Sequence, residues 1–159
     1  MQKVFHFDSP VEVYRADACV LTCFDARFEL VTRKFLRRRG VELYDQIKIP
    51  GAAKALAAPA SEGDRDFVLR MVATSMALHH PARMILTGHN ECGAYLSHPV
   101  EEVMADIDRA AQVIHAAIPS LAIERYFFDF DGVYVALSWL EGWASSDGAA
   151  VPVDHSAVI

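Results

Sequence analysis

The chain has 159 residues, of which 53% are apolar and 23% are charged, and its formal net charge is -6. This is the composition of an ordinary globular protein, so general disorder is excluded. The acidic balance argues against nucleic acid or an anionic membrane as a partner. No apolar run approaches the roughly 18–20 residues of a membrane span. The first residues also lack the apolar stretch of a secretory signal.

The cysteine count bears on the redox compartment of the protein. Three cysteines is an odd number for a disulfide framework, and a chain of this size does not need one. We therefore expect a cytoplasmic protein with reduced thiols, free for metal or chemistry. No repeat or linker divides the sequence, which predicts a single domain over residues 1–159. Its core spans about 16–139, and 141–159 are expected to be a loose tail.

Apolar patterning predicts an alternation of strands and helices. In chain order, the elements are a strand at 18–22, a helix at 28–39, a strand at 46–49, a helix at 61–80, a strand at 84–87, a helix at 99–119, and strands at 122–128 and 133–137. Ser61 is expected to cap the second helix, and Pro99 to open the third at its first helical position. The pattern predicts an α/β fold with a central, mostly parallel β-sheet flanked by helices, made of four strands and an edge strand.

Two polar segments directly follow predicted strands. Residues 23–27 (Cys-Phe-Asp-Ala-Arg) come after the first strand, and 89–93 (His-Asn-Glu-Cys-Gly) come after the third. Parallel sheets place their chemistry just beyond the carboxyl ends of the strands. If the first and third strands are neighbours, the two segments meet there.

Cys23, His89 and Cys92 carry the side chains of a zinc site. Two thiolates and one imidazole with a vacant fourth position are typical of catalytic zinc. Cys19 is not expected to be a ligand, because four residues of strand span about 13 Å. We interpret it as a small buried apolar residue. The alternative for the other three is two buried thiols and one hydrogen-bonded histidine.

Asp25 and Arg27 lie two positions apart in the first segment. An aspartate held by a bidentate arginine stays ionised and keeps its orientation. Such a carboxylate, an acceptor only, can take the hydrogen of a zinc-bound hydroxide and turn its lone pair towards a substrate. The alternative is an ion pair that only fixes the loop.

The two segments together resemble those of the β-class carbonic anhydrases, which have Cys-x-Asp-x-Arg followed about 65 residues later by His-x-x-Cys-Gly. The resemblance extends over about residues 16–139. It implies that Cys23, His89 and Cys92 bind Zn²⁺ and that Asp25 and Arg27 form a catalytic dyad, with Asp25 either on or off the metal. The implied activity is reversible hydration of carbon dioxide to bicarbonate by a zinc-bound hydroxide. The resemblance also implies a homodimer or a higher homo-oligomer.

One loop departs from this family. The segment after the second strand often reads Arg-Asn-Ala-Gly in the family, whereas residues 49–53 here are Ile-Pro-Gly-Ala-Ala. Two alternatives therefore stay open: a zinc-binding protein without hydratase activity, and a hydrolase of an analogue such as carbonyl sulfide or carbon disulfide. We expect the Ala-rich stretch 52–60 to form an apolar wall of the pocket. Gly88 and Gly93 are expected to let the backbone pass close to the metal.

Overall fold

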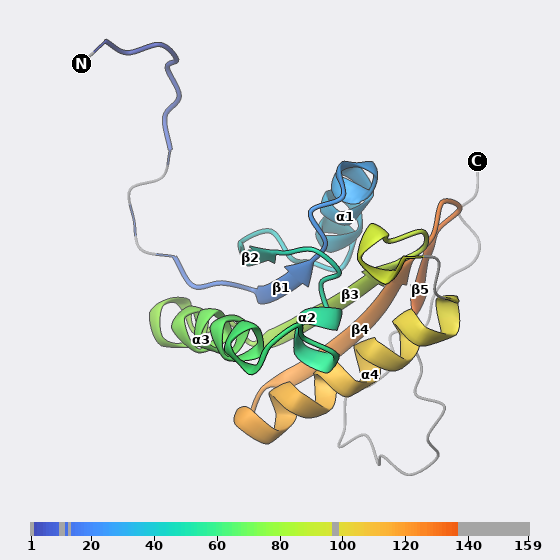
Figure 1. Ribbon diagram of the computed structural model, residues 1–159. Coiled ribbons are helices and arrows are strands. Elements are labelled where there is room, and N and C mark those ends of the chain that lie inside the picture. The colour runs from blue at the N-terminus through green and yellow to red at the C-terminus, as the bar shows by residue number, and fades with distance from the viewer. Residues whose placement is uncertain (1, 10–11, 13, 97–98, 137–159) are drawn as a thin grey trace.

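The computed structural model describes residues 2–9, 12, 14–96 and 99–136, which include a sheet with the strand order β2-β1-β3-β4-β5 (Figure 1). The strands are β1 (Ala18–Thr22), β2 (Tyr44–Lys48), β3 (Arg83–His89), β4 (Ala122–Phe128) and β5 (Val133–Val135). The first four pair in parallel, and β5 is antiparallel to β4. The predicted α/β fold is confirmed, and the first and third strands are indeed neighbours.

Helices cover both faces of the sheet (Figure 1). A short 3-10 turn, η1 (Ala26–Phe28), leads into α1 (Glu29–Arg38) on one face. On the other face lie α2 (Lys54–Ala57), α3 (Glu62–His79) and α4 (Val100–Ala117). A second 3-10 turn, η2 (Gly93–Tyr95), follows β3. In the described part of the chain, no helix is both long and apolar enough to cross a membrane.

Alternation along each strand gives the sheet two apolar faces. On the α1 side, Leu36 packs in a cluster with Val20 of β1 and Ile85 of β3. On the opposite side, Leu21 and Leu86 pack in the larger cluster to which α2, α3 and α4 contribute. Because β1 and β3 are buried on both faces, their carboxyl ends are held at fixed positions, and these ends carry the candidate site.

Most helix boundaries agree with the sequence patterns. Ser61 caps α3 as predicted, because its Oγ accepts a hydrogen bond of 3.2 Å from the backbone N–H of Asp64. The prediction for Pro99 was wrong by one position: Pro99 is the extended N-cap residue, and Val100 is the first helical residue. The last predicted strand reaches residue 137, which lies outside the described residues, as does the predicted tail at 141–159.

Candidate metal centre

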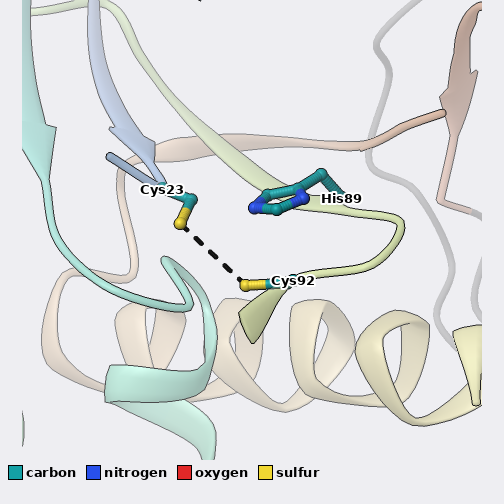
Figure 2. Close-up of side chains that lie close together, drawn as sticks. All are labelled: Cys23, His89 and Cys92. Carbon is teal, nitrogen blue, oxygen red and sulfur yellow. Dashed lines mark hydrogen bonds between the residues drawn. The ribbon is translucent and has the colours of Figure 1, made fainter. Parts of the chain in front are cut away.

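The three predicted metal ligands come together at the carboxyl edge of the sheet. Cys23 directly follows β1, His89 is the last residue of β3, and Cys92 precedes η2. Figure 2 shows the three side chains pointing toward one another. The two sulfur atoms are 3.9 Å apart, and all three ligand atoms lie within 4.8 Å of one another. The pairing of parallel strands β1 and β3 produces this meeting, because it aligns their ends.

The spacing of the sulfur atoms fits a shared zinc ion. Two sulfur ligands at a Zn–S distance of about 2.3 Å and a tetrahedral angle would be about 3.8 Å apart. The observed Sγ–Sγ distance between Cys23 and Cys92 is 3.9 Å. A disulfide would require about 2.05 Å, and both residues are free cysteines. The residues present therefore fit a tetrahedral metal ion.

The imidazole of His89 is oriented by two neighbours. Its Nδ1 is 2.7 Å from the carbonyl oxygen of Asn90, so Nδ1 carries the hydrogen and donates it. The ring packs against Phe28, with 4.5 Å between ring centroids. The other nitrogen, Nε2, is buried and makes no hydrogen bond among the described residues. An Nε2 lone pair that is buried, unpartnered and directed toward two thiols is the geometry of a metal ligand.

Backbone N–H groups favour negative charge on the sulfur atoms. The contact with the Cys92 sulfur, the nearby imidazole of His89 and the backbone N–H groups of Asp25 and Gly51 lower the pKa of the Cys23 thiol to about 4, against the effect of burial. The same contact with Cys23, together with burial, raises the pKa of Cys92, while amides of Ala94 and Gly51 oppose that rise. The first thiolate therefore forms readily, and a bound cation would favour the second.

Asp25 and Arg27 form the ion pair that the sequence predicted. The Arg27 Nε donates to both carboxylate oxygens at 3.1 Å, and Nη2 donates to Oδ2 at 2.7 Å. The backbone N–H of Arg27 also donates to Oδ1, at 2.9 Å. These hydrogen bonds from Arg27 lower the pKa of Asp25 to about 2. The carboxylate is therefore ionised and fixed in orientation.

Glu91 is a member of the site that the sequence analysis did not identify. Arg27 Nη1 donates to Glu91 Oε2 at 3.2 Å, and Nη2 donates to the Glu91 carbonyl at 3.0 Å. One arginine thus joins the two polar segments. The only sequence signal is the position of Glu91 inside the second segment, and nothing in its pattern indicates a contact with Arg27.

A pocket of about 630 Å³ opens over the candidate metal centre. It is lined by residues 23–27 of the first segment, Pro50 and Gly51 after β2, and residues 91–94 of the second segment. Phe24, Ala26, Pro50 and Ala94 give it apolar walls, while Asp25, Arg27 and Glu91 supply the charges. Such a pocket suits a small molecule with little polarity.

The predicted apolar wall at residues 52–60 was wrong in its position. Ala52, Ala53 and Leu56 are almost fully buried in the core and do not line the pocket. The chain turns directly after Gly51 into α2, which the sequence analysis did not predict. The Nζ of Lys54 in this helix donates to the Ala94 carbonyl at 2.7 Å. Helix α2 is therefore joined by this hydrogen bond to the segment that follows Cys92.

The structure gives Gly88 a role in packing, and the close approach of Gly88 and Gly93 to a metal ion stays a prediction. A Cβ on Gly88 would lie 2.6 Å from Val103 Cγ1 and 2.9 Å from Ile107 Cδ1, so Gly88 allows α4 to pack closely on β3. A Cβ on Gly93 would meet nothing within 4 Å. The interpretation of Cys19 as a buried apolar residue is confirmed. Its side chain is fully buried, and burial raises its pKa to about 11.

Together, the parallel sheet and the cysteine–histidine group at its carboxyl edge define an α/β protein with a candidate metal centre. Comparison with known proteins narrows this class. Residues 14–137 match the model of a family described as "Putative carbonic anhydrase". The match spans well over half of the chain, and the chain belongs to this family. The match therefore confirms the resemblance to carbonic anhydrases that the two polar segments indicated.

Individual relatives are distant. An uncharacterized protein of Rickettsia bellii is 25% identical over 130 residues, which cover 74% of this chain and 79% of the relative. A carbonic anhydrase from Streptococcus mutans superposes with a TM-score of 0.61 at 12% identity, covering 83% of this chain and 89% of the other. A β-carbonic anhydrase from Trichomonas vaginalis gives 0.59 at 12% identity, with 83% and 88% covered. At such identities, the two structures establish the fold.

Proposed function

We propose that this chain is a zinc enzyme that reversibly hydrates carbon dioxide to bicarbonate. The observation that carries the proposal is the group of Cys23, His89 and Cys92, whose ligand atoms lie within 4.8 Å of one another. The ion pair of Asp25 and Arg27 lines the same pocket. Membership of the carbonic anhydrase family supports this class of reaction.

The roles divide between the two polar segments. Cys23, His89 and Cys92 would hold the zinc ion, which supplies the Lewis acidity that makes water a nucleophile near neutral pH. Two thiolates offset the zinc charge and make water less acidic than three imidazoles would. A nearby acceptor therefore matters. Asp25 would accept the hydrogen of the attacking oxygen and aim its lone pair at the substrate carbon.

We further propose that Asp25 stays off the metal. Both of its carboxylate oxygens accept hydrogen bonds from Arg27, at distances between 2.7 and 3.1 Å. To become a metal ligand, the carboxylate would have to give up part of this bidentate contact, which charge assistance makes strong. Arg27 would thus act as the positioning residue for Asp25.

The test combines elemental analysis with stopped-flow kinetics on the same sample. We expect about one zinc ion per chain and measurable hydration of carbon dioxide. In Asp25→Ala, we expect hydration to fall by about 10- to 100-fold while zinc content stays unchanged. Protein purified without chelators and free of zinc would overturn the proposal. Zinc without hydration over a range of pH would instead indicate a binding protein or a different substrate.

The apolar wall of the pocket favours a second candidate reaction. Phe24, Ala26, Pro50 and Ala94 would contact carbonyl sulfide or carbon disulfide as well as carbon dioxide. The same zinc protein should therefore be assayed with carbonyl sulfide, by following sulfide release. Sulfide release by a preparation that does not hydrate carbon dioxide would identify an analogue hydrolase.

We also propose that the chain forms a homodimer in the cytoplasm. Phe24 is 61% exposed and Phe130 58% exposed, and large apolar side chains of this kind are common in interfaces. The three cysteines are free, as expected in a reducing compartment. Light scattering coupled to size-exclusion chromatography would test the dimer, and a monomeric mass over the concentration range would contradict it.

A further inference from the structure

We propose that Glu91 is a specificity-determining residue that keeps small anions out of the metal pocket, so that the site admits neutral molecules. This inference rests on the metal site proposed above, and it adds a function for a side chain outside the ligands and the Asp25–Arg27 pair.

Arg27 is the one cationic side chain among the described residues that line the pocket. Its guanidinium has five N–H groups. Nε serves both oxygens of Asp25, and Nη2 serves Asp25 Oδ2 and the Glu91 carbonyl. Nη1 donates to Glu91 Oε2. Four of the five donors are therefore in use. A pair of donors that could grip a second carboxylate or bicarbonate is not left.

The charge balance leads to the same conclusion. One guanidinium faces two carboxylates, those of Asp25 and Glu91, in ion pairs of 2.7 and 3.2 Å. Two cysteine thiolates would balance the charge of a zinc ion. The rim of the pocket is thus left with one excess negative charge, on a Glu91 side chain that is 66% exposed. A negative rim repels anions and leaves neutral molecules unaffected.

The backbone holds Glu91 in this position. Glu91 has a φ of +50°, which is uncommon for a residue other than glycine. Its N–H donates to Asn90 Oδ1 at 2.8 Å, and Asn90 Nδ2 donates to Asp129 Oδ1 at 2.9 Å. The conformation that brings the Glu91 carbonyl and carboxylate to Arg27 is therefore built into the loop. Without Glu91, Arg27 would keep its contact with Asp25 and expose free N–H donors toward the pocket.

The expected consequence is weak binding of anions at the metal. Carbon dioxide would enter without electrostatic opposition, whereas the negative rim would favour the release of bicarbonate and weaken its rebinding. The experiment uses cobalt(II)-substituted protein and thiocyanate as the probe, with binding followed by visible absorption. Glu91→Gln removes the charge at nearly constant size. We expect thiocyanate to bind on the order of threefold to tenfold more tightly to this variant.

Asp66→Asn is the matched control, because it removes one negative charge from an exposed position on α3. It should leave thiocyanate affinity unchanged. Equal affinities in wild type and Glu91→Gln would overturn the proposal, as would an equal gain in the control. A gain confined to Glu91→Gln would support it.

A second readout does not need the metal. In metal-free protein, phenylglyoxal should modify Arg27 faster in Glu91→Ala than in wild type. The variant lacks the carboxylate that accepts a hydrogen bond from Arg27 Nη1, so this nitrogen is free to react. Peptide mapping by mass spectrometry would assign the modification to Arg27. An unchanged rate would overturn the role of Glu91. Failure of the protein to bind cobalt would instead count against the proposed metal site, so the two failures are distinguishable.

Discussion

Gly51 faces Ala94 so closely that a methyl group on Gly51 would lie 3.0 Å from the Cβ of Ala94. Gly51 also has a φ of +73°, where side chains are strained. Its backbone lowers the pKa of Cys23 and opposes the rise in the pKa of Cys92. The loop at residues 49–53, which departs from the family pattern, therefore acts on the candidate metal centre through its backbone, which any residue type can supply. Its conformation at Gly51, however, favours glycine.

Gly51→Ala should weaken metal binding. The added methyl group must move either the 51 loop or the segment at Ala94, and the backbone of both favours the thiolate forms of the cysteines. Gly40→Ala is the control, because Gly40 has a similar φ of +70° with nothing within 4 Å of the added Cβ. Both variants should lose about 1–2 kcal/mol of stability from the left-handed conformation. Only Gly51→Ala should lose zinc affinity, measured by competition with a chelating dye; equal affinities would contradict this.

Cys92→Ser should abolish stoichiometric zinc binding and lower the melting temperature of zinc-loaded protein toward that of the metal-free form. Metal affinity and folding stability are coupled, because the ligands meet only in the folded state. Cys19→Ala provides a matched cysteine control, since Cys19 is fully buried and outside the ligand group. It should lower stability and keep one zinc per chain. Retention of zinc by Cys92→Ser would remove Cys92 from the ligand set.

Arg27→Lys should reduce hydration while leaving zinc content unchanged. A lysine keeps the positive charge but cannot hold both oxygens of Asp25 in the bidentate geometry of the guanidinium. We expect kcat to fall by about 10- to 100-fold, because the carboxylate loses its fixed direction. Stopped-flow assays and elemental analysis on the same preparation would test this. Full activity in Arg27→Lys would show that only the charge matters.

Glu124 should make the folded state sensitive to acid. Burial alone would raise its pKa, but hydrogen bonds from Tyr126 and Arg83, with the charges of Arg83 and Arg39, lower it below the ordinary 4.5. A lowered pKa means that the carboxylate stabilises the fold above pH 4.5, and that this contribution is lost as the pH falls through the lowered value.

The corresponding variant is Glu124→Gln, whose free energy of unfolding should fall by about 1–3 kcal/mol at pH 7. The deficit relative to wild type should shrink as the pH is lowered below 4.5. Denaturant titrations at several pH values would measure it. Glu12→Gln, at an exposed position, should show little deficit at any pH. A deficit in Glu124→Gln that is independent of pH would contradict the assigned ion pairs.

The sequence predicted the features that depend on local pattern. Apolar periodicity located α1, α3, α4 and the parallel strands, and Ser61 marked the start of α3 through its own hydrogen bond. The juxtaposition of Cys23 with His89 and Cys92 was expected if the first and third strands are neighbours, and the strand order meets that condition. Both follow from rules that need no side-chain packing.

Features that depend on distant packing could not be predicted in this way. Helix α2 is four residues long and Ala-rich, too short to show a helical period. The contact of Arg27 with Glu91 joins residues 64 positions apart through side chains whose directions are set by the finished loops. The packing of Phe28 on His89 has the same origin, and a pattern of apolar residues assigns Phe28 to the core without showing which ring it touches.

The strand order has a consequence for the synthesis of the protein. β1 is made first but lies inside the sheet, between β2 and β3. A growing chain therefore releases Cys23 long before its partners, and the proposed three-ligand site can form only after β3 has inserted beside β1. Metal loading would follow the pairing of β3 with β1, and a chain cut short before His89 would hold only one of the three proposed ligands, Cys23. Bound zinc would then distinguish chains in which β1 and β3 have paired from chains that end before Cys92.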